Sequence, residues 1–255
     1  MQAARLVCSL QRTVRGQVLR FAPLRCIHQS KMVSFDSANK AGRCEGFLQG
    51  DPSQTKAGLV VLHEWWGLND QIQEAAAEMV LEGNLMTLIP DLYRGEIASD
   101  MITAADLMTS LDWHGAMDDA VAAVKYLLSN GCSKVGITGF SMGGALSLAT
   151  AAVSREISAA SSFYGIPILS LADLSAITVP VQCHFGELDE IAGFSSLKDV
   201  EILRRILKAG EVPNDIFLYP VGHAFTNPNS DTYVESISQL ALHRLVTFMK
   251  KHLAT

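Results

Sequence analysis

Residues 134–144 read KVGITGFSMGG, and this stretch decides the fold. The run KVGIT (134–138) predicts a buried strand, and the small residues from about 142 to 153 predict a helix. Between them, residues 139–143 match the pattern G-x-S-x-G. In that setting the pattern predicts a sharp, strained turn that presents Ser141 at the carboxyl edge of a sheet. Ser141 is therefore the candidate nucleophile, and the first N–H groups of the helix would face a developing oxyanion.

Apolar runs and helical patterns alternate on both sides of this stretch. Residues 116–128 carry an apolar face at helical spacing, and the C-terminal region does so through Ile237, Ala241, Leu245 and Phe248. The alternation is typical of a mostly parallel central sheet with helices on both faces, and with the serine turn it predicts a single α/β-hydrolase domain over residues 42–252. Five more apolar runs predict strands: 58–62, 85–89, 159–164, 179–185 and 216–219.

A serine nucleophile needs a base, and four histidines follow Ser141 in the chain. In this fold the order is serine, then an acid, then histidine. His184 lies inside a predicted strand, where a core role is the usual one, and positions 243 and 252 lie in the last helix. His223, in the loop VGHAF (221–225) after the last strand, is therefore the candidate base.

The base in turn needs an acid that holds its ring in place. Asp189 follows the strand 179–185, and we expect it to be this acid. Glu187 and Glu190 are the alternatives in the same loop.

Composition and the absence of certain motifs exclude several classes of protein. The chain has 255 residues, of which 49% are apolar and 18% charged, so it can bury a sizeable core. Five cysteines without a C-x-x-C pair indicate a reduced compartment. No apolar run approaches the roughly 18 residues of a membrane span, and metal and nucleotide motifs such as H-E-x-x-H and G-x-G-x-x-G are absent. We therefore expect a monomer that acts on a small molecule without metal or cofactor.

The first 35 residues differ from the rest in charge. They hold six basic side chains and no acid, which leaves 20 − 6 = 14 basic and 26 acidic residues in the remainder, a net charge of −12. Because nucleic acid is also negatively charged, this acidic remainder of the chain is not expected to bind it. The basic segment, with Leu6, Val7, Leu10 and Val14 on one side of a helical wheel, predicts a mitochondrial transit peptide. The alternatives are a plastid transit peptide, a disordered basic tail, or translation from Met32 to give a cytoplasmic protein.

Six motifs in order resemble the dienelactone hydrolase (carboxymethylenebutenolidase-like) family from about residue 44 to 252. The resemblance implies hydrolysis of a lactone or ester through a covalent acyl-enzyme, with a nucleophile–His–Asp triad. The alternatives are a thioesterase with the same triad, or a catalytically weak member that binds a lactone-like ligand. The motifs are HEWWG (63–67), PDLYRG (90–95), GFSMGG (139–144), FYG (163–165), HFGELD (184–189) and GHAF (222–225).

The same resemblance suggests roles for further residues. Glu64 would be the carboxylate beside the nucleophile, although a solvent-facing carboxylate at a strand end is the alternative. The backbone N–H groups of Trp65 and Met142 would form the oxyanion hole. Arg94 and Tyr164 are possible substrate contacts.

Two positions depart from the family pattern. The usual nucleophile is cysteine, whose thiol a nearby carboxylate can help to ionise, whereas Ser141 must give its proton to His223. The role of Glu64 is then open: it could hold a water, bind the hydroxyl, or be a relic of thiol chemistry. Some members also carry an arginine where this chain has Asn227, so a carboxylate-bearing dienelactone is not the expected substrate.

Overall fold

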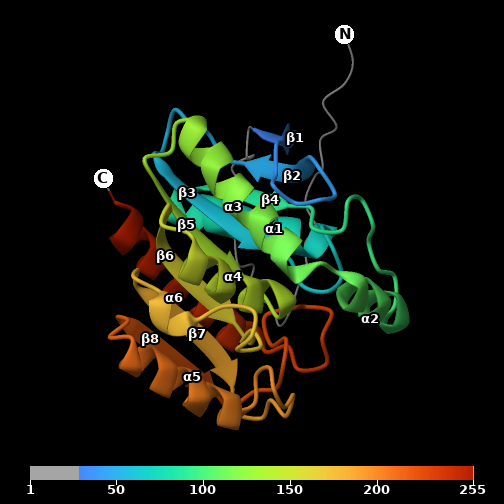
Figure 1. Cartoon of the computed structure of the whole chain (residues 1–255), viewed down its shortest axis with the longest axis vertical. Helices are drawn as coiled ribbons and strands as arrows, with labels where there is room; N and C mark the ends of the chain where they lie inside the picture. The colour runs from blue at the N-terminus through green and yellow to red at the C-terminus, as the bar shows by residue number, and fades with distance from the viewer. Residues whose placement is uncertain (1–28, 255) are drawn as a thin grey trace, which may run out of the picture.

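The computed structural model describes residues 29–254, whose centre is an eight-stranded sheet (Figure 1). The strand order is β1-β2-β4-β3-β5-β6-β7-β8. β1 and β2 pair antiparallel with each other, β2 pairs antiparallel with β4, and the remaining pairs are parallel. The strands are β1 (Ser30–Phe35), β2 (Cys44–Gln49), β3 (Ala57–Leu62), β4 (Met86–Pro90), β5 (Lys134–Gly139), β6 (Ile157–Phe163), β7 (Val181–Gly186) and β8 (Asn214–Tyr219).

Helices cover both faces of this sheet. α3 and α4 pack on one face against β3 to β6, and in Figure 1 they lie in front of it, whereas α1 and α6 pack on each other and on the opposite face. The predicted α/β-hydrolase fold class is confirmed. The helices are α1 (Asp70–Gly83), α2 (Met101–Ser110), α3 (Trp113–Ser129), α4 (Met142–Val153), α5 (Leu197–Ala209) and α6 (Glu235–Leu253), with a short 3₁₀ turn at Leu174–Ala176.

The central strands and α4 form the core. A strand that is covered on both faces has apolar residues at successive positions rather than at alternate ones. Val60, Val61 and Leu62 of β3 are accordingly all fully buried. α4 is buried along almost its whole length between the sheet and α3. Its run of glycine and alanine therefore lets it lie close to the strands. The carboxyl ends of β3 to β8 consequently meet at one firmly packed edge.

The N-terminal boundary needs a correction. Residues 30–35, assigned from the sequence to the basic extension, form β1, which pairs with β2 so that Met32 lies opposite Phe47. β1 is an edge strand held by backbone hydrogen bonds, and Phe35 alone of its side chains is buried, so its composition gave little indication of a strand. The transit-peptide prediction concerns residues 1–28, outside the described residues, and stays a prediction. Within residues 29–254, no helix has the length and apolar character needed to cross a membrane.

Candidate active site

Ser141 lies on the turn between β5 and α4, with φ +51° and ψ −114°. Such a backbone conformation is unfavourable for a residue with a Cβ, by about 1–3 kcal/mol, and tight packing maintains it. The glycines of the motif make that packing possible. A Cβ on Gly139 would lie 2.2 Å from the carbonyl oxygen of Gly143, and one on Gly143 would lie 2.3 Å from the carbonyl oxygen of Leu62. The strained turn predicted from G-x-S-x-G is therefore present.

The structure brings Ser141, His223 and Asp189 together from the ends of three strands. The Ser141 Oγ lies 3.0 Å from Nε2 of His223, and Nδ1 of His223 lies 2.7 Å from Oδ2 of Asp189. The other carboxylate oxygen of Asp189 accepts the N–H of Ile191 at 3.1 Å, and the residue is only 4% exposed. Because a carboxylate can only accept, Nδ1 carries the ring proton, and Nε2 is left to accept the Ser141 hydroxyl proton.

Ser195 is a further member of this group that the sequence reasoning missed. Its side chain is fully buried, and its Oγ lies 3.3 Å from Nδ1 of His223, beside Asp189. The loop that holds it is closed by hydrogen bonds from the backbone of Ser195 and Ser196 to the carbonyl of Ile191. A serine in a loop carries no pattern that would have singled it out.

Glu64 is buried, 3% exposed, and both of its carboxylate oxygens accept hydrogen bonds. The Tyr164 hydroxyl donates to Oε1 at 3.1 Å, and the Asn227 side-chain amide donates to Oε2 at 2.5 Å. Burial raises the pKa of Glu64, while these two hydrogen bonds and the nearby His223 oppose the rise. The alternative of a solvent-facing carboxylate is wrong.

Tyr164 is fully buried, with its hydroxyl 2.6 Å from Oγ1 of Thr226 in addition to the contact with Glu64. Burial and the charge of Glu64 both raise the pKa of this phenol well above its ordinary value. Its ring meets the ring of His223 edge-on, with centroids 5.0 Å apart. The suggested substrate contact is therefore corrected: the hydroxyl is already occupied, and the ring supports the histidine.

Arg94 is the sequence candidate that the structure places elsewhere. Its guanidinium donates to Oδ1 of Asp119 at 2.8 Å and to the carbonyl oxygen of Asp91 at 3.0 Å. Asp119 lies on α3 with its side chain wholly buried, and a buried carboxylate needs a paired cation. Arg94 is thus paired with α3 and makes no hydrogen bond to Ser141, His223 or Asp189, and sequence spacing could not reveal this pairing.

The segment HEWWG lies beside the serine turn. Gly67 donates its N–H to the carbonyl of Glu64 at 3.2 Å, which closes a tight turn over Trp65 and Trp66. His63 fixes this turn, because its Nδ1 contacts the Glu64 carbonyl at 2.6 Å and its Nε2 accepts the N–H of Leu92 at 3.2 Å. Burial lowers the pKa of His63 to about 4, so the ring is neutral and structural.

Two backbone N–H groups beside the serine turn have no hydrogen-bond partner among residues 29–254. Within the described part of the chain, the N–H groups of Trp65 and Met142 have no hydrogen-bond acceptor. Met142 opens α4, so its N–H belongs to the positive end of the helix dipole. Donors of this kind are what an oxyanion hole requires.

His184 has the core role that the strand position suggested. Its ring nitrogens contact the Tyr219 hydroxyl at 2.9 Å and the Gln182 side chain at 3.0 Å, and it stacks on Phe163. Burial lowers the pKa of His184 to about 3. No group of three or more His, Cys, Asp or Glu side chains among residues 29–254 is placed to hold a metal ion.

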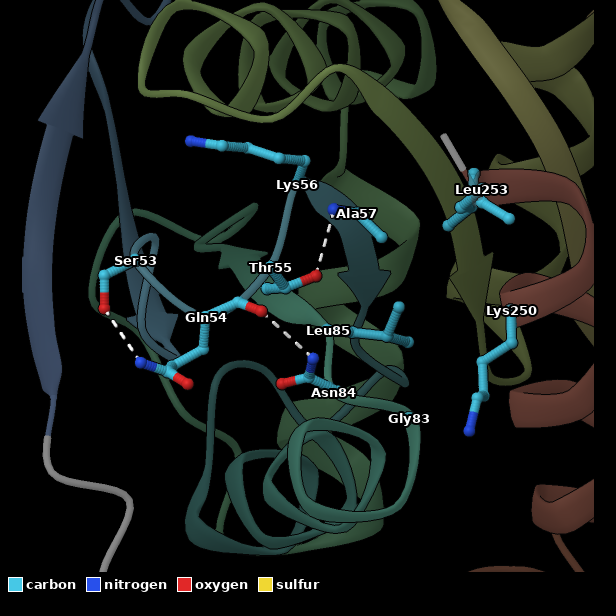
Figure 2. Close-up of a pocket in the computed structure, with 11 residues that line it drawn as sticks. Ser53, Gln54, Thr55, Lys56, Ala57, Gly83, Asn84, Leu85, Lys250 and Leu253 are labelled. Carbon is cyan, nitrogen blue, oxygen red and sulfur yellow. Dashed lines mark hydrogen bonds between the residues drawn. The ribbon is translucent and has the colours of Figure 1, made fainter.

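A cavity of about 500 Å³ lies at the other edge of the sheet (Figure 2). Its lining includes Lys56 and Ala57 at the start of β3, Asn84 after α1, and Lys250 near the end of α6. Ser141 follows the carboxyl end of β5, which runs parallel to β3. The cavity is therefore a full strand length away from Ser141 and takes no part in the group around it.

Comparison with known proteins gives consistent matches along the chain. The model of the dienelactone hydrolase family matches residues 44–253. "Protein usf" of Aquifex pyrophilus is 32% identical over 236 residues, covering 88% of this chain and 99% of that protein. The carboxymethylenebutenolidase of Pseudomonas putida is 26% identical, covering 82% of this chain and 92% of that protein.

Solved structures agree with these matches at the level of the fold. A dienelactone hydrolase-like promiscuous phosphotriesterase from metagenomic libraries superposes with a TM-score of 0.76 at 20% identity, covering 88% of this chain and 99% of that one. An esterase of Pyrococcus furiosus superposes with a TM-score of 0.67 at 14% identity, covering 89% of this chain and 94% of that one.

Proposed function

We propose that this chain works through an acyl-enzyme formed on Ser141, because it belongs to the dienelactone hydrolase family and is thereby a carboxylic ester or lactone hydrolase. The observation that carries the proposal is the 3.0 Å contact between the Ser141 Oγ and Nε2 of His223, on a turn whose strain only tight packing would maintain.

The geometry supports a conventional sequence of steps. His223 takes the Ser141 proton as Oγ attacks the ester carbonyl, and the N–H groups of Met142 and Trp65 stabilise the resulting oxyanion. When the tetrahedral intermediate collapses, His223 returns the proton to the leaving alkoxide. Water then attacks the acyl-enzyme with His223 again as base, and collapse of this second intermediate breaks the bond to Ser141, whose oxygen takes the proton back from His223. Asp189 holds the imidazole in the required tautomer and stabilises its charged form.

We further propose that Glu64 positions the loop that carries His223. Asn227 and Thr226 follow His223 in that loop, and Glu64 holds the first directly and the second through Tyr164. A serine hydroxyl is too weak an acid for Glu64 to ionise, so this carboxylate has no thiolate to control here. Instead, the hydrogen bond from Asn227 joins the end of β3 to the loop after β8, and the one from Tyr164 joins it to the residue that follows β6.

Exchanging the two partners tests this role of Glu64. Glu64→Gln places two amides against each other and should lower kcat/KM for p-nitrophenyl acetate about tenfold, a loss of about 1.4 kcal/mol that is typical of one buried hydrogen bond to a charged group. Asn227→Asp alone places two carboxylates together and should be at least as damaging. The double variant Glu64→Gln/Asn227→Asp restores one donor and one acceptor, and it should recover to within about threefold of wild type.

Two results would contradict the positioning role. If the double variant were no better than the single ones, the pairing of Glu64 with Asn227 would not be what matters. If Glu64→Gln alone were as damaging as His223→Ala, Glu64 would be a primary catalytic group. Thermal unfolding of each variant, followed by circular dichroism, separates a lost fold from a displaced base.

The acyl-enzyme itself is tested by rapid kinetics with p-nitrophenyl acetate. We expect a burst of p-nitrophenolate close to one equivalent of enzyme, followed by a slower steady rate, because deacylation of a small acetyl group lags behind its formation. Acid quenching during the burst should trap an acetyl group on the peptide that contains Ser141. A linear time course with no trapped acetyl group would favour direct attack by water, and a ligand-binding protein would give no turnover at all.

A further inference from the structure

The loops that follow the parallel strands, at the carboxyl edge of the sheet, are almost free of cations. The loops that follow its parallel strands, together with α2, contain one lysine or arginine, Arg94, before Lys198 in the first turn of α5. Arg94 is already paired with the buried Asp119. Asn227, which lies against Glu64, is uncharged, and its side-chain amide is committed to that carboxylate. A negatively charged substrate would thus find no unpaired guanidinium or ammonium group on these loops.

Acidic side chains are frequent on the same loops. Glu96 and Asp100 are exposed after β4, and Glu187 and Glu190 are exposed on either side of Asp189. Inside, Glu64 and Asp189 are buried acids close to His223. A substrate carboxylate would be repelled both on approach and when bound, because like charges in a partly desolvated site disfavour each other strongly.

Large apolar side chains are exposed at the same edge. The loop after β7 exposes Leu188 by 68% and Ile191 by 45%, directly beside Asp189. The loop after β6 exposes Ile168 by 65% and Leu169 by 60%. The segment after β4 exposes Ile97 by 54%. These five residues are called the apolar rim.

Backbone hydrogen bonds connect two of the loops that carry the apolar rim to segments near the catalytic group. Ile166, just before Ile168, donates its N–H to the carbonyl of Phe194 at 2.8 Å, and the ring of Phe194 lies 6.2 Å from the ring of His223. Ala98, next to Ile97, donates its N–H to the carbonyl of Trp66 at 3.0 Å. The loops that carry Ile168 and Ile97 are thus tied to the segments of Phe194 and Trp66, and Leu188 and Ile191 lie in the loop of Asp189. Exposed apolar side chains on such loops offer a surface for substrate.

We propose that the substrate of this site is an uncharged ester with an apolar acyl or alcohol chain that lies against the rim, rather than a carboxylate-bearing lactone. The inference rests on the proposed function, since it concerns the same nucleophile. The rim contributes by removing substrate CH₂ groups from water, and the acidic loops contribute by excluding anions.

A matched pair of substrates tests the proposal on the full chain. p-Nitrophenyl hexanoate and the p-nitrophenyl monoester of adipic acid have acyl chains of equal carbon number, and they differ in a terminal methyl or carboxylate group. We expect kcat/KM to be at least about 30-fold higher for hexanoate, and about tenfold higher for hexanoate than for acetate, through a lower KM. Equal or greater activity on the adipate monoester would overturn the proposal. So would a preference for an ester with a terminal trimethylammonium group, since charge would then decide specificity.

Rim variants identify the surface responsible. The double variant Ile168→Ser/Leu169→Ser should lose most of the hexanoate preference, measured as the ratio of kcat/KM for hexanoate to that for acetate. Ile168→Lys should raise adipate turnover several-fold at low salt and lose that gain at high salt. The control is Val153→Ser, 57% exposed at the far end of α4, which should change nothing. An unchanged preference in the double variant would overturn the role of the rim. The failures are separable: if acetate hydrolysis does not depend on Ser141, the proposed function itself fails.

Discussion

Replacing Ser141 with Ala should lower kcat for p-nitrophenyl acetate by about 10⁵–10⁶-fold, and replacing His223 with Ala should do nearly the same. Without the hydroxyl no acyl-enzyme forms, and without the imidazole the hydroxyl keeps its proton, because the 3.0 Å contact is its route of proton transfer. The two residues act as a unit, so the double variant should be no worse than either single one. The measurement is steady-state kinetics on all three variants.

A matched serine controls for the substitution. Ser170 is exposed in the loop after β6, at the same edge of the sheet, and Ser170→Ala should retain wild-type turnover. Alanine keeps a Cβ at position 141, so the strained turn and the free energy of unfolding should change little. Near-full esterase activity in Ser141→Ala would show that the nucleophile lies elsewhere, and losses that add in the double variant would mean that the two residues act separately.

Replacing Asp189 with Asn should lower kcat by about 10³–10⁴-fold with little change in KM. The amide can present its NH₂ group to Nδ1 of His223, which moves the ring proton to Nε2, where it blocks acceptance from Ser141. Ser195 offers Nδ1 a second hydrogen-bond partner at 3.3 Å, so Ser195→Ala should worsen the Asn variant more than it affects wild type. Kinetics of the four combinations give this coupling directly.

The sequence offered two other acids in the same loop, and they serve as controls. Glu187 and Glu190 are exposed, so Glu187→Gln and Glu190→Gln should stay within about twofold of wild type. A larger loss for either of them than for Asp189→Asn would move the orienting acid to that residue.

Sequence reasoning located the centre of the molecule well because central elements have strong patterns. Continuous apolar runs marked the strands from β3 to β8, and the predicted helix 142–153 coincides with α4. It missed both β1 and β2, which pair antiparallel with each other. The residues of β1 are mostly exposed, and backbone pairing with β2 provides its stability. It also did not separate α1, α2 and α5, which are more peripheral.

In the candidate site, the positions of the main residues could be predicted from the sequence, but most of their side-chain partners could not. Ser141, Asp189 and His223 follow the ends of strands in the order this fold requires, so their convergence could be predicted. The actual partners of side chains could not: Arg94 is bound to Asp119, and Tyr164 to Glu64 and Thr226, through contacts between segments far apart in the chain. Ser195 likewise acquires its place only through the fold of its loop.

Labelling with a fluorophosphonate, followed by mass mapping of the digested protein, identifies the nucleophile directly. Such a probe reacts with a serine hydroxyl that a neighbouring base has activated. We expect a single phosphonylated site on the peptide that contains Ser141, with stoichiometry near one. Labelling should be nearly abolished in His223→Ala and blocked by a hydrolysable ester such as p-nitrophenyl hexanoate. An unlabelled wild-type protein that still hydrolyses esters, or a label on another residue with Ser141 unmodified, would contradict it.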